Sequence, residues 1–457
     1  MEDTIAAIAT AYGEGGIGII RISGETALPL LEEIFEPFAQ GEKPVNRKMT
    51  YGRIVDRQTG QTVDECLAVY MKGPRTYTAE DVVEIDCHGS VVSLRRTLEL
   101  ILRSGARMAE PGEFTKRAFL NGRIDLSQAE AVVDTVRAKT EKSHEAALSQ
   151  LEGALSRQVR TIRAALLDLL VNVTVNLDYP DEDIEEITYD NLINQISLIG
   201  EMIEKLRATT ATGRMIRDGI RVVIGGRPNV GKSSLMNGLL RESRAIVTDV
   251  PGTTRDTIEE VMDIRGIPVY LIDTAGIHDT EDRVEKLGIQ RSRDAFEQAD
   301  YIILVLDGSQ PLQEEDEQLL AEIRGRKSLV LINKEDLGGR ISPEDLKEIL
   351  PGADVLTTSM ATGSGITEVE DRIEELVYGG QLHQENSVLV TSVRHGELLR
   401  QAAEDLERGL AMARRREPLD LIEVDVRSAY DALGEMIGET VTDTVLDEVF
   451  SRFCLGK

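Results

Sequence analysis

The stretch Gly226-Arg227-Pro228-Asn229-Val230-Gly231-Lys232-Ser233 constrains the fold of this chain more than any other. Its spacing, G-x-x-x-x-G-K-S, is typical of a phosphate-binding loop between a strand and a helix. Residues 220–224 form a β-branched run that indicates a buried strand, and residues 234–240 have the pattern of a helix. We therefore predict an α/β nucleotide-binding domain in which Lys232 contacts the β- and γ-phosphates and Ser233 binds Mg²⁺.

The composition indicates a soluble, multidomain protein. A chain of 457 residues is too long for one hydrophobic core, so two to four domains are expected. No apolar run reaches the length of a membrane span, and the first residues carry no basic leader, which predicts a cytoplasmic protein. The three cysteines, Cys66, Cys87 and Cys454, have neither metal-ligand spacing nor the pattern of a disulfide framework.

The formal charge of −29 argues against a freestanding nucleic-acid-binding protein, because such proteins are usually basic. If RNA is the substrate, a basic partner or a local basic patch must contribute to holding it. His88 beside Cys87 could suggest a metal site, but without a second Cys/His cluster nearby a structural role is the better interpretation.

The order of patterns predicts a helical domain interrupted by an inserted α/β domain. Residues 1–118 are expected to form an α+β module, with a glycine-rich turn at 13–18 between two strands and an alternating strand at 82–89. Helical periodicity begins near Asp125, where Gln128 completes a possible capping box. The expected domain boundaries are 1–118, 119–217 (helical, first part), 218–376 (inserted α/β) and 377–457 (helical, second part). The expected parallel strands of the inserted domain are 221–224, 269–272, 301–306, 328–332 and 355–358.

Further motifs follow the phosphate loop in the order that a GTPase requires. They are Gly252-Thr253-Thr254, Asp273-Thr274-Ala275-Gly276, Asn333-Lys334-Glu335-Asp336 and Ser359-Met360-Ala361. Asp273 would hold Mg²⁺ through water, and the Gly276 N–H would approach the γ-phosphate. The Asp336 carboxylate would accept both N–H groups of guanine, which adenine lacks, so the motif predicts selectivity for GTP over ATP.

One position departs from the Ras-like pattern. The glutamine that orients the attacking water in Ras-like enzymes is replaced here by Ile277, whose side chain can neither donate nor accept a hydrogen bond. Glu285 is a nearby carboxylate that could take over this role. On the residues alone, an ordinary solvated helix charge is an equally good interpretation of Glu285.

Taken together, the chain resembles the tRNA-modification GTPase family MnmE, also called TrmE. The resemblance extends over essentially the whole chain and rests on four stretches beside the GTPase motifs. These are Asp3 to Thr10, Gly15 to Gly24, Pro111 to Gly122 (Pro-Gly-Glu-Phe-Thr with Ala-Phe-Leu-Asn-Gly) and Phe453-Cys454-Leu455-Gly456-Lys457.

The resemblance implies a tetrahydrofolate site in the N-terminal module, which would also dimerise the protein. The ligand, 5,10-methylenetetrahydrofolate or a 5-formyl analogue, would lie near Arg21, Glu84, Arg123 and Lys457. Cations suit the glutamate tail of a folate, and a carboxylate suits the N–H edge of its pterin. Family members often have lysine where Arg123 stands, which keeps the charge. For Cys454, a catalytic role and simple packing both stay open.

For the inserted domain, the resemblance implies GTP hydrolysis that depends on K⁺ and on association of two G domains. Glu285 aligns with the water-orienting glutamate of the family, and Lys232 with the phosphate-binding lysine. Mg²⁺ would be held by Ser233, Thr254 and, through water, Asp273, and K⁺ by Asn229, Thr248, Val250 and Thr253. The expected GTP-binding residues are Asn229, Val230, Gly231, Lys232, Ser233, Ser234, Thr248, Asp249, Val250, Pro251, Gly252, Thr253, Thr254, Asp273, Thr274, Ala275, Gly276, Asn333, Lys334, Asp336, Ser359, Met360 and Ala361.

The implied reaction builds an aminomethyl-type group, carboxymethylaminomethyl in the full form, on C5 of the wobble uridine of certain tRNAs. A flavoprotein partner, MnmG, would supply FAD and NADH chemistry within a heterotetramer, and glycine or ammonium would supply the nitrogen. The alternative is a regulatory or ribosome-assembly GTPase without substrate chemistry. The N-terminal module favours the first interpretation, because a simple switch has no need of a folate site.

Overall fold

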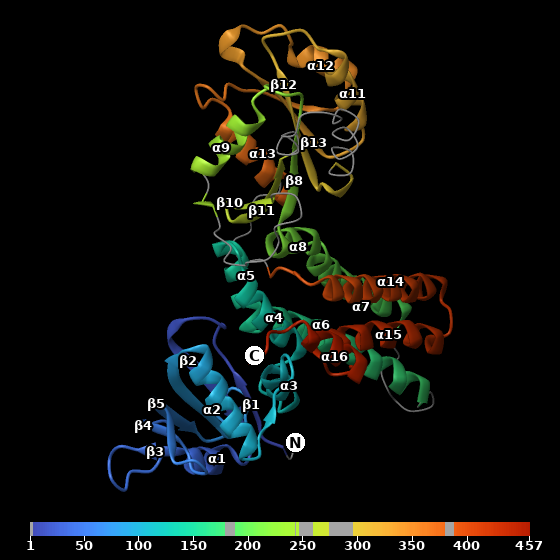
Figure 1. The fold of residues 1–457 in the computed structure, drawn as a ribbon. Helices are drawn as coiled ribbons and strands as arrows, with labels where there is room; N and C mark the ends of the chain where they lie inside the picture. The colour runs from blue at the N-terminus through green and yellow to red at the C-terminus, as the bar shows by residue number, and fades with distance from the viewer. Residues whose placement is uncertain (1–2, 179–187, 243, 246–258, 274–295, 380–387) are drawn as a thin grey trace. The chain divides into compact units, whose positions relative to one another are not determined.

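The computed structural model describes residues 3–178, 188–242, 244–245, 259–273, 296–379 and 388–457 (Figure 1). The chain forms two compact units. One comprises Met1–Val133, Leu151–Arg163 and Tyr430–Lys457, and the other comprises Asp134–Gln150 and Ala164–Ala429. The fold class is the mixed one expected: an N-terminal α+β module, a set of helices and an α/β domain inserted between them.

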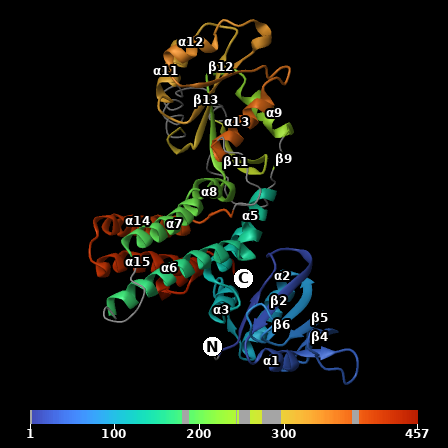
Figure 2. The ribbon, with the colours of Figure 1, turned by 180° about the vertical axis from the view of Figure 1, so that it is seen from behind.

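The N-terminal module is a seven-stranded sheet in the order β3-β4-β5-β6-β2-β1-β7. All neighbouring strands are antiparallel except β1 and β7. Helices α1 and α2 pack against one face, where alternate strand residues join one hydrophobic core (Figures 1 and 2). The strands are β1 (Ile5–Ile8), β2 (Gly15–Ser23), β3 (Phe35–Pro37), β4 (Met49–Asp56), β5 (Gln61–Met71), β6 (Val82–Gly89) and β7 (Arg107–Met108). The helices are α1 (Ala27–Ile34), α2 (Val91–Arg103) and α3 (Glu113–Leu120).

The glycine-rich stretch differs from its expectation. Residues 13–18 were expected to form a turn, but β2 already begins at Gly15 and pairs with β6 across a bulge. A Cβ on Gly89 would lie 2.3 Å from the Gly15 carbonyl oxygen, and one on Gly18 would lie 2.6 Å from Leu94 of α2. These glycines therefore allow a strand and a helix to approach closely, rather than forming the turn itself.

Arg117 of α3 is a fully buried cation that joins three parts of the N-terminal module. Its guanidinium donates to Asp3 Oδ1 (2.9 Å), to Glu113 Oε1 (3.0 Å) and to Glu80 Oε2 (3.1 Å). The Arg117 side chain has 0% exposure. A buried guanidinium is tolerated only when it is paired and hydrogen-bonded, so these contacts hold the first strand, the 72–81 loop and α3 together.

Two of the carboxylates around Arg117, Asp3 and Glu113, are held in their charged form. The pKa of Asp3 is lowered, chiefly by the hydrogen bond from Arg107. Burial would raise the pKa of Glu113, but the hydrogen bonds from Arg107, the Glu110 backbone and Arg117 outweigh it, so its pKa is also lowered. Both groups therefore stabilise the module above their unfolded pKa of about 4, and this contribution is lost as the pH falls through their lower folded values.

The inserted domain is a second seven-stranded sheet, in the order β14-β13-β12-β8-β11-β10-β9. The five expected strands are confirmed as parallel neighbours. The antiparallel β10 and β9 were not expected. The strands are β8 (Ile220–Gly225), β9 (Arg244–Ala245), β10 (Glu259–Ile264), β11 (Ile267–Asp273), β12 (Tyr301–Asp307), β13 (Ser328–Asn333) and β14 (Asp354–Thr357).

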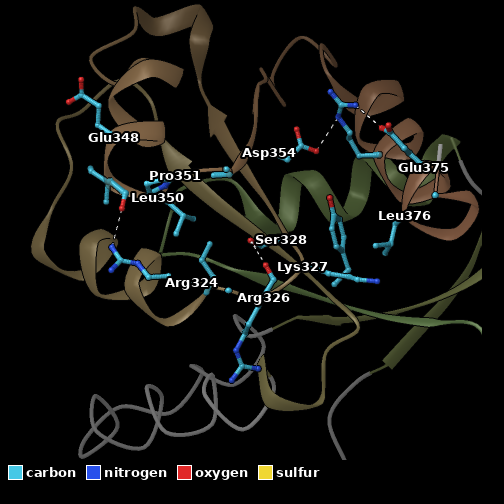
Figure 3. Close-up of a pocket in the computed structure, with 18 residues that line it drawn as sticks. Arg324, Arg326, Lys327, Ser328, Glu348, Leu350, Pro351, Asp354, Glu375 and Leu376 are labelled. Atoms are coloured by element: carbon cyan, nitrogen blue, oxygen red, sulfur yellow. Dashed lines mark hydrogen bonds and ion pairs between the residues drawn. The ribbon is translucent and has the colours of Figure 1, made fainter.

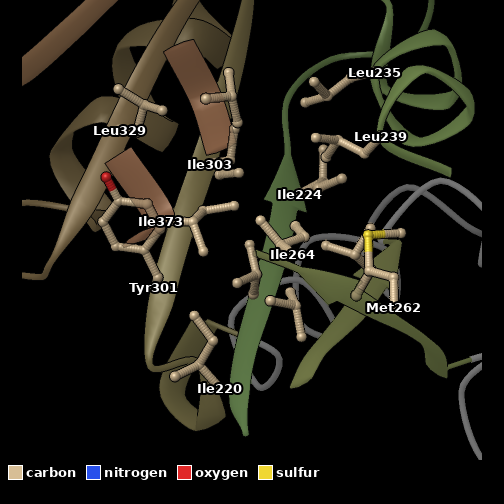
Figure 4. Packing of buried hydrophobic residues seen from close by; sticks show 14 of the residues in the cluster. Ile220, Ile224, Leu235, Leu239, Met262, Ile264, Tyr301, Ile303, Leu329 and Ile373 are labelled. Atoms are coloured by element: carbon tan, nitrogen blue, oxygen red, sulfur yellow. The ribbon is translucent and has the colours of Figure 1, made fainter. Parts of the chain in front are cut away.

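Helices cover both faces of this sheet. On one face, α9 and α13 bury a cluster that includes Ile224, Leu235, Ile303 and Ile373 (Figure 4). On the other face, α11 and α12 cover alternate residues of the same strands. The central strands are thus buried on both sides, which explains their continuous apolar sequence. The helices are α9 (Lys232–Glu242), α11 (Glu314–Glu322), α12 (Pro343–Ile349) and α13 (Ile366–Tyr378), with a 3₁₀ helix at Glu335–Leu337.

The remaining helices flank the inserted domain in the sequence. They are α4 (Leu126–Arg137), α5 (Glu141–Leu151), α6 (Ala154–Asp178), α7 (Tyr189–Arg207), α8 (Thr210–Asp218), α14 (Val393–Arg415), α15 (Leu419–Ile437) and α16 (Asp443–Ser451). The capping box of α4 is confirmed, since Asp125 Oδ1 accepts from the Gln128 N–H and Gln128 Oε1 accepts from the Asp125 N–H, both at 3.0 Å. Among the described residues, no helix combines the length and apolarity needed to cross a membrane.

The hairpin of β10 and β11 is held at its tip and along β11 by the two residues that precede α5. Thr140 Oγ1 donates to the Gly266 carbonyl (2.7 Å), and Lys139 Nζ donates to the Tyr270 hydroxyl (2.7 Å) while lying 4.5 Å from the centre of its ring. At the same tip, Arg265 forms ion pairs with three carboxylates of α13: Glu370, Asp371 and Glu374. The hairpin is therefore fixed both within its domain and to the helix before it.

Replacing Arg117 with methionine should destabilise the N-terminal module by about 3–5 kcal/mol, because three carboxylates lose a buried partner. Arg95→Met is the control: Arg95 lies 3.7 Å from Glu99 in an exposed pair, and its loss should cost less than about 1 kcal/mol. Urea unfolding at pH 7, followed by proteolytic cleavage within residues 3–133, measures both changes. Repeating it at pH 4 should give a smaller difference between Arg117→Met and the wild type. Equal stabilities of the two variants at pH 7 would contradict the assignment.

Candidate phosphate and one-carbon sites

The predicted phosphate loop lies at the carboxyl end of β8, between that strand and α9. Its backbone requires glycine: Gly226 has φ +139° and Gly231 has φ +112°. A Cβ on Gly226 would lie 2.3 Å from the Val305 carbonyl oxygen, and one on Gly231 would lie 2.1 Å from Asn333 Nδ2. The loop is therefore pressed against the ends of β12 and β13, with the amino end of α9 directly behind it.

Polar groups of the loop are arranged around its concave side. Lys232 is largely buried, and its Nζ donates to the carbonyls of Gly226 (2.7 Å) and Arg227 (2.8 Å). Asn229, Ser233 and Ser234 are exposed, whereas Val230 is buried. The lysine ammonium thus lies over the loop, and the hydroxyl of Ser233 is accessible to a metal ion.

Asn333 connects the phosphate loop to the predicted base-recognition segments. Its Nδ2 donates to the Val230 carbonyl (2.8 Å), and its Oδ1 accepts from the Met360 N–H (3.0 Å). Ser359 Oγ donates to Asp336 Oδ1 at 2.6 Å. The structure therefore brings Asn333, Asp336, Ser359 and Met360 together at the loop. Ala361 follows in the turn that the Ser359–Ser364 bridge closes.

Lys334 is fixed by an acidic partner. Its backbone is left-handed, with φ +68°, and its Nζ lies 2.7 Å from Asp307 Oδ2 at the end of β12. Burial alone would raise the pKa of Asp307, but the hydrogen bonds from Lys334 and Ser309 outweigh it and lower this pKa. The ion pair orients the Lys334 stem beside the position that a base would occupy.

One anchor of the loop could not be found from the motifs. Arg227, the second residue of the loop, donates from Nε to Asp316 Oδ1 of α11 at 2.8 Å. Asp316 is nearly fully buried and also closes the capping box of α11 through the Gln313 N–H. This buried pair ties the loop to a helix 89 residues further along the chain. The only signal in the sequence is that an arginine occupies a variable position of the loop.

Several predicted residues lie outside the described part of the chain. They are Thr248, Asp249, Val250, Pro251, Gly252, Thr253, Thr254, Thr274, Ala275, Gly276 and Glu285. Asp273 ends β11 next to Ile224 of β8, so its backbone lies at the same sheet edge as the phosphate loop.

A cleft of about 940 Å³ lies in the inserted domain, but it is not the nucleotide site (Figure 3). It is lined by Tyr301, Ser328 and Asp354, the first residues of β12, β13 and β14. Because these strands are parallel to β8, the cleft lies at their amino ends, opposite the edge that carries the phosphate loop. Its arginines are engaged locally, Arg324 with the Ile349 carbonyl and Arg372 with Asp354 and Glu375.

In the N-terminal module, Arg21 and Glu84 are brought together on the sheet face opposite α1 and α2. They are cross-strand neighbours on β2 and β6, and Arg21 Nη2 lies 2.8 Å from Glu84 Oε1. Arg21 Nη1 also lies 3.5 Å from the Gly456 carbonyl oxygen, which places Lys457 directly after this contact. Gly456 has φ +87°, and a Cβ there would lie 2.3 Å from the Ile8 carbonyl oxygen. Cys454 is exposed, and its side chain is not among the contacts of Arg21.

Arg123 joins this group through Tyr77, a residue that the motifs did not single out. Arg123 Nη1 donates to the Tyr77 carbonyl (2.9 Å), and its Cζ lies 4.8 Å from the centre of the Tyr77 ring. The guanidinium carbon of Arg21 lies 5.5 Å from the same ring centre. Tyr77 thus links two of the predicted site residues.

His88 and Cys87 do not form a metal site. His88 Nδ1 shares a hydrogen bond with Asp64 Oδ1 (2.7 Å), and this bond raises the pKa of His88. Cys87 is buried in the core. Within the described ranges, no group of three or more metal-binding side chains is present.

The comparisons with known proteins cover the whole chain. A family model described as "MnmE helical domain" matches residues 126–454, and one described as "GTP-binding protein TrmE N-terminus" matches residues 4–123. Curated proteins named "tRNA modification GTPase MnmE" are similar over their full length and that of this chain, with 52% identity in Alkaliphilus metalliredigens and 46% in Bacillus subtilis. The G domain of the Thermotoga maritima FeoB iron transporter is 27% identical over 34% of this chain and 98% of its own, with a TM-score of 0.27.

The Asn333 contact provides a test of the nucleotide site. Asn333→Ala should weaken binding of GDP about tenfold or more, because the buried Val230 carbonyl and Met360 N–H each lose a partner. Arg324→Met, which removes a hydrogen bond at the opposite end of the sheet, should leave the affinity unchanged. Titration with a fluorescent GDP analogue measures both variants. An unchanged affinity in Asn333→Ala would show that the loop does not depend on this side chain.

Proposed function

Because the chain belongs to the MnmE family of tRNA modification GTPases, we propose that it hydrolyses GTP as part of a reaction that modifies tRNA. The observation that carries the proposal is the bridge of Asn333 between the phosphate loop and Met360, with Asp336 beside it. This arrangement presents a phosphate cradle and a base-reading carboxylate to one nucleotide. Lys232 would shift from the loop carbonyls to the β- and γ-phosphates when the nucleotide binds.

In detail, the proposed product is a carboxymethylaminomethyl or related group on C5 of the wobble uridine. A methylenetetrahydrofolate would give the one-carbon unit, and glycine or ammonium would give the nitrogen. The flavoprotein MnmG, in a heterotetramer with this chain, would supply FAD and NADH. The charge of −29 supports a division of labour in which a basic partner makes most of the tRNA contacts. Arg21, Glu84, Arg123 and Lys457 are proposed to hold the folate, with Cys454 as a neighbour.

Hydrolysis is proposed to require K⁺ and the association of two G domains. K⁺ beside the β- and γ-phosphates would neutralise charge that develops in the transition state, in place of an arginine finger. Asn229 supports this assignment, because its side chain is exposed in the loop and carries an amide oxygen. Thr248, Val250 and Thr253 would complete the ion's ligands. Mg²⁺ would be bound by Ser233 and Thr254, with Asp273 acting through water.

Two copies of the chain are proposed to associate through the N-terminal module. The outer face of β4 and β5 supports this, since Met49, Tyr51 and Leu67 are exposed there and the Tyr51 ring packs at a tilt, 4.8 Å between centres, against exposed Phe38. Neighbouring exposed apolar side chains are common where a second protein binds.

Glu285→Ala tests the enzymatic proposal. The variant should bind GTP with unchanged affinity but hydrolyse it about 100-fold or more slowly, because no carboxylate orients the water. In a mixture with MnmG, FAD, NADH, methylenetetrahydrofolate, glycine and tRNA, it should also form little modified uridine, as measured by nucleoside mass spectrometry. Glu297→Ala is the control for losing an exposed carboxylate. Rapid hydrolysis by wild-type protein without any tRNA modification would instead favour a regulatory GTPase.

The K⁺ proposal is tested by GTP turnover in KCl and NaCl of equal ionic strength. Turnover should be about tenfold or more faster in KCl, and Asn229→Ala should lose this difference. Association of the protein with GDP and aluminium fluoride should follow the same cation dependence. Equal rates in the two salts would contradict the K⁺ mechanism while leaving GTP hydrolysis itself intact.

A further inference from the structure

Three cations occupy four consecutive positions at the edge of the cleft in the inserted domain. Arg324, Arg326 and Lys327 lie between α11 and β13, line the cleft and are all exposed; we call them the basic rim. Arg324 donates to the Ile349 carbonyl (3.1 Å) and Arg326 to the Phe296 carbonyl (2.7 Å), and both carbonyls are uncharged. A guanidinium has five N–H donors, so most donors of each arginine remain available to a ligand.

The carboxylates that line the cleft do not neutralise the basic rim. Asp354 and Glu375 are both paired with Arg372, at 3.2 Å and 2.8 Å. The third, Glu348, directs its carboxylate away from Arg324 (Figure 3). Across the residues that the structure describes, no carboxylate forms an ion pair with a cation of the rim. The rim therefore keeps its positive charge, although the whole chain has a formal charge of −29.

The backbone that carries the rim is fixed by its neighbours. The Lys327 carbonyl accepts from the Ile302 N–H of β12 (3.1 Å), and the Arg326 N–H donates to the Ile323 carbonyl (3.0 Å). Gly325 has φ +78°, and a Cβ there would meet nothing within 4 Å, so the turn is open to its surroundings. The rim is thus presented from a defined place before a ligand binds.

The three side chains leave the turn in different directions (Figure 3). Arg324 extends toward α12, whereas Arg326 and Lys327 extend away from it and from each other. A single small anion would need the three charges to converge on one point. Charges that are spread along an edge instead suit a polyanion with phosphates at intervals, such as the backbone of RNA.

The place of the rim also suits a ligand other than the nucleotide. The cleft lies at the amino ends of the parallel strands, and the phosphate loop lies at their carboxyl ends. A polyanion on the rim would therefore not compete with GTP. Its loss should change RNA binding without changing the nucleotide site.

We propose that the basic rim binds the phosphate backbone of the tRNA. This inference rests on the proposed tRNA-modifying function and assigns part of the tRNA contact to the inserted domain. Contacts of this kind position an RNA and contribute affinity that depends on salt, but they do not read its sequence.

The salt dependence of tRNA binding tests the proposal in the full-length chain. Labelled tRNA with an unmodified wobble uridine is titrated with wild-type protein by fluorescence anisotropy between about 50 and 200 mM NaCl. Arg324→Gln/Lys327→Gln should bind about tenfold more weakly at the lowest salt, and the slope of log K against log [NaCl] should fall by about two. Arg326 is kept, because it donates to the carbonyl of the buried core residue Phe296.

Two further variants separate the rim from folding and from net charge. Lys327→Gln alone should lower the slope by about one; among the described residues, the Lys327 side chain has no hydrogen bond or ion pair to lose. Arg400→Gln/Arg427→Gln removes the same charge from arginines that pair with Glu397, Glu404 and Glu423, and should keep the wild-type slope. All variants should retain the GTP turnover of the wild type.

Four results would overturn the inference. The first two are a wild-type slope in both rim variants and an equal loss in the Arg400/Arg427 control. The third is displacement of tRNA by inorganic phosphate beyond the effect of NaCl at equal ionic strength, which would indicate a site for one small anion. The last is no binding of tRNA by the wild-type chain at the lowest salt. In each case the proposed function would stand if the mixture with MnmG still modified tRNA, and it would fall if the wild-type mixture did not.

Discussion

The N-terminal module depends on one buried guanidinium. Arg117 has to be paired with carboxylates to be tolerated in the interior, and its partners come from the residues before β1, the 72–81 loop and its own helix. The same requirement fixes the loop that carries Tyr77, because Thr78 and Glu80 of that loop both share hydrogen bonds with Ser23. The hydrogen-bond partners of Arg117 include neither Arg21 nor Arg123, so it bears on their surroundings only through the loop and helix that it fixes.

Hydrophobic periodicity was sufficient to predict the parallel strands of the inserted domain but not its antiparallel edge. Continuous apolar runs identify strands buried on both faces, as in Tyr301–Asp307. The β10–β11 hairpin lacked its usual signal, because its turn has positive φ at Arg265 (+53°) and at Gly266 (+85°), where asparagine commonly precedes glycine. The turn expected at residues 13–18 was wrong from Gly15 onward, where β2 begins. Within this stretch Gly18 allows the close approach of Leu94 of α2, a contact between distant residues that the sequence pattern does not reveal.

At the candidate sites, too, residues within a short motif were predicted from the sequence, whereas contacts between residues far apart in the chain were not. Motif spacing predicted Lys232, Asn333 and Asp336 as site residues because each has a fixed place after a strand, and the structure places Asn333 against the loop that carries Lys232. It could not identify Asp316 as the partner of Arg227, since any exposed-looking acid in α11 was an equal candidate before the fold was known. Tyr77 was missed likewise, because it contacts Arg123, which lies 46 residues further along the chain. A lone tyrosine in a loop belongs to no motif whose spacing could be recognised.

The hairpin of β10 and β11 also connects the nucleotide edge of the inserted domain with the residues that precede α5. Its six residue pairs form a continuous ladder, which is stiff along the strands, and β11 ends at Asp273 beside the phosphate loop. Side-chain contacts of Lys139 and Thr140 attach this hairpin to the residues before α5. A displacement of β11 at the nucleotide edge would be carried along the paired strands to the contacts of Lys139 and Thr140. The connection between the nucleotide edge and the residues before α5 therefore includes the side chains of Lys139, Thr140 and Tyr270.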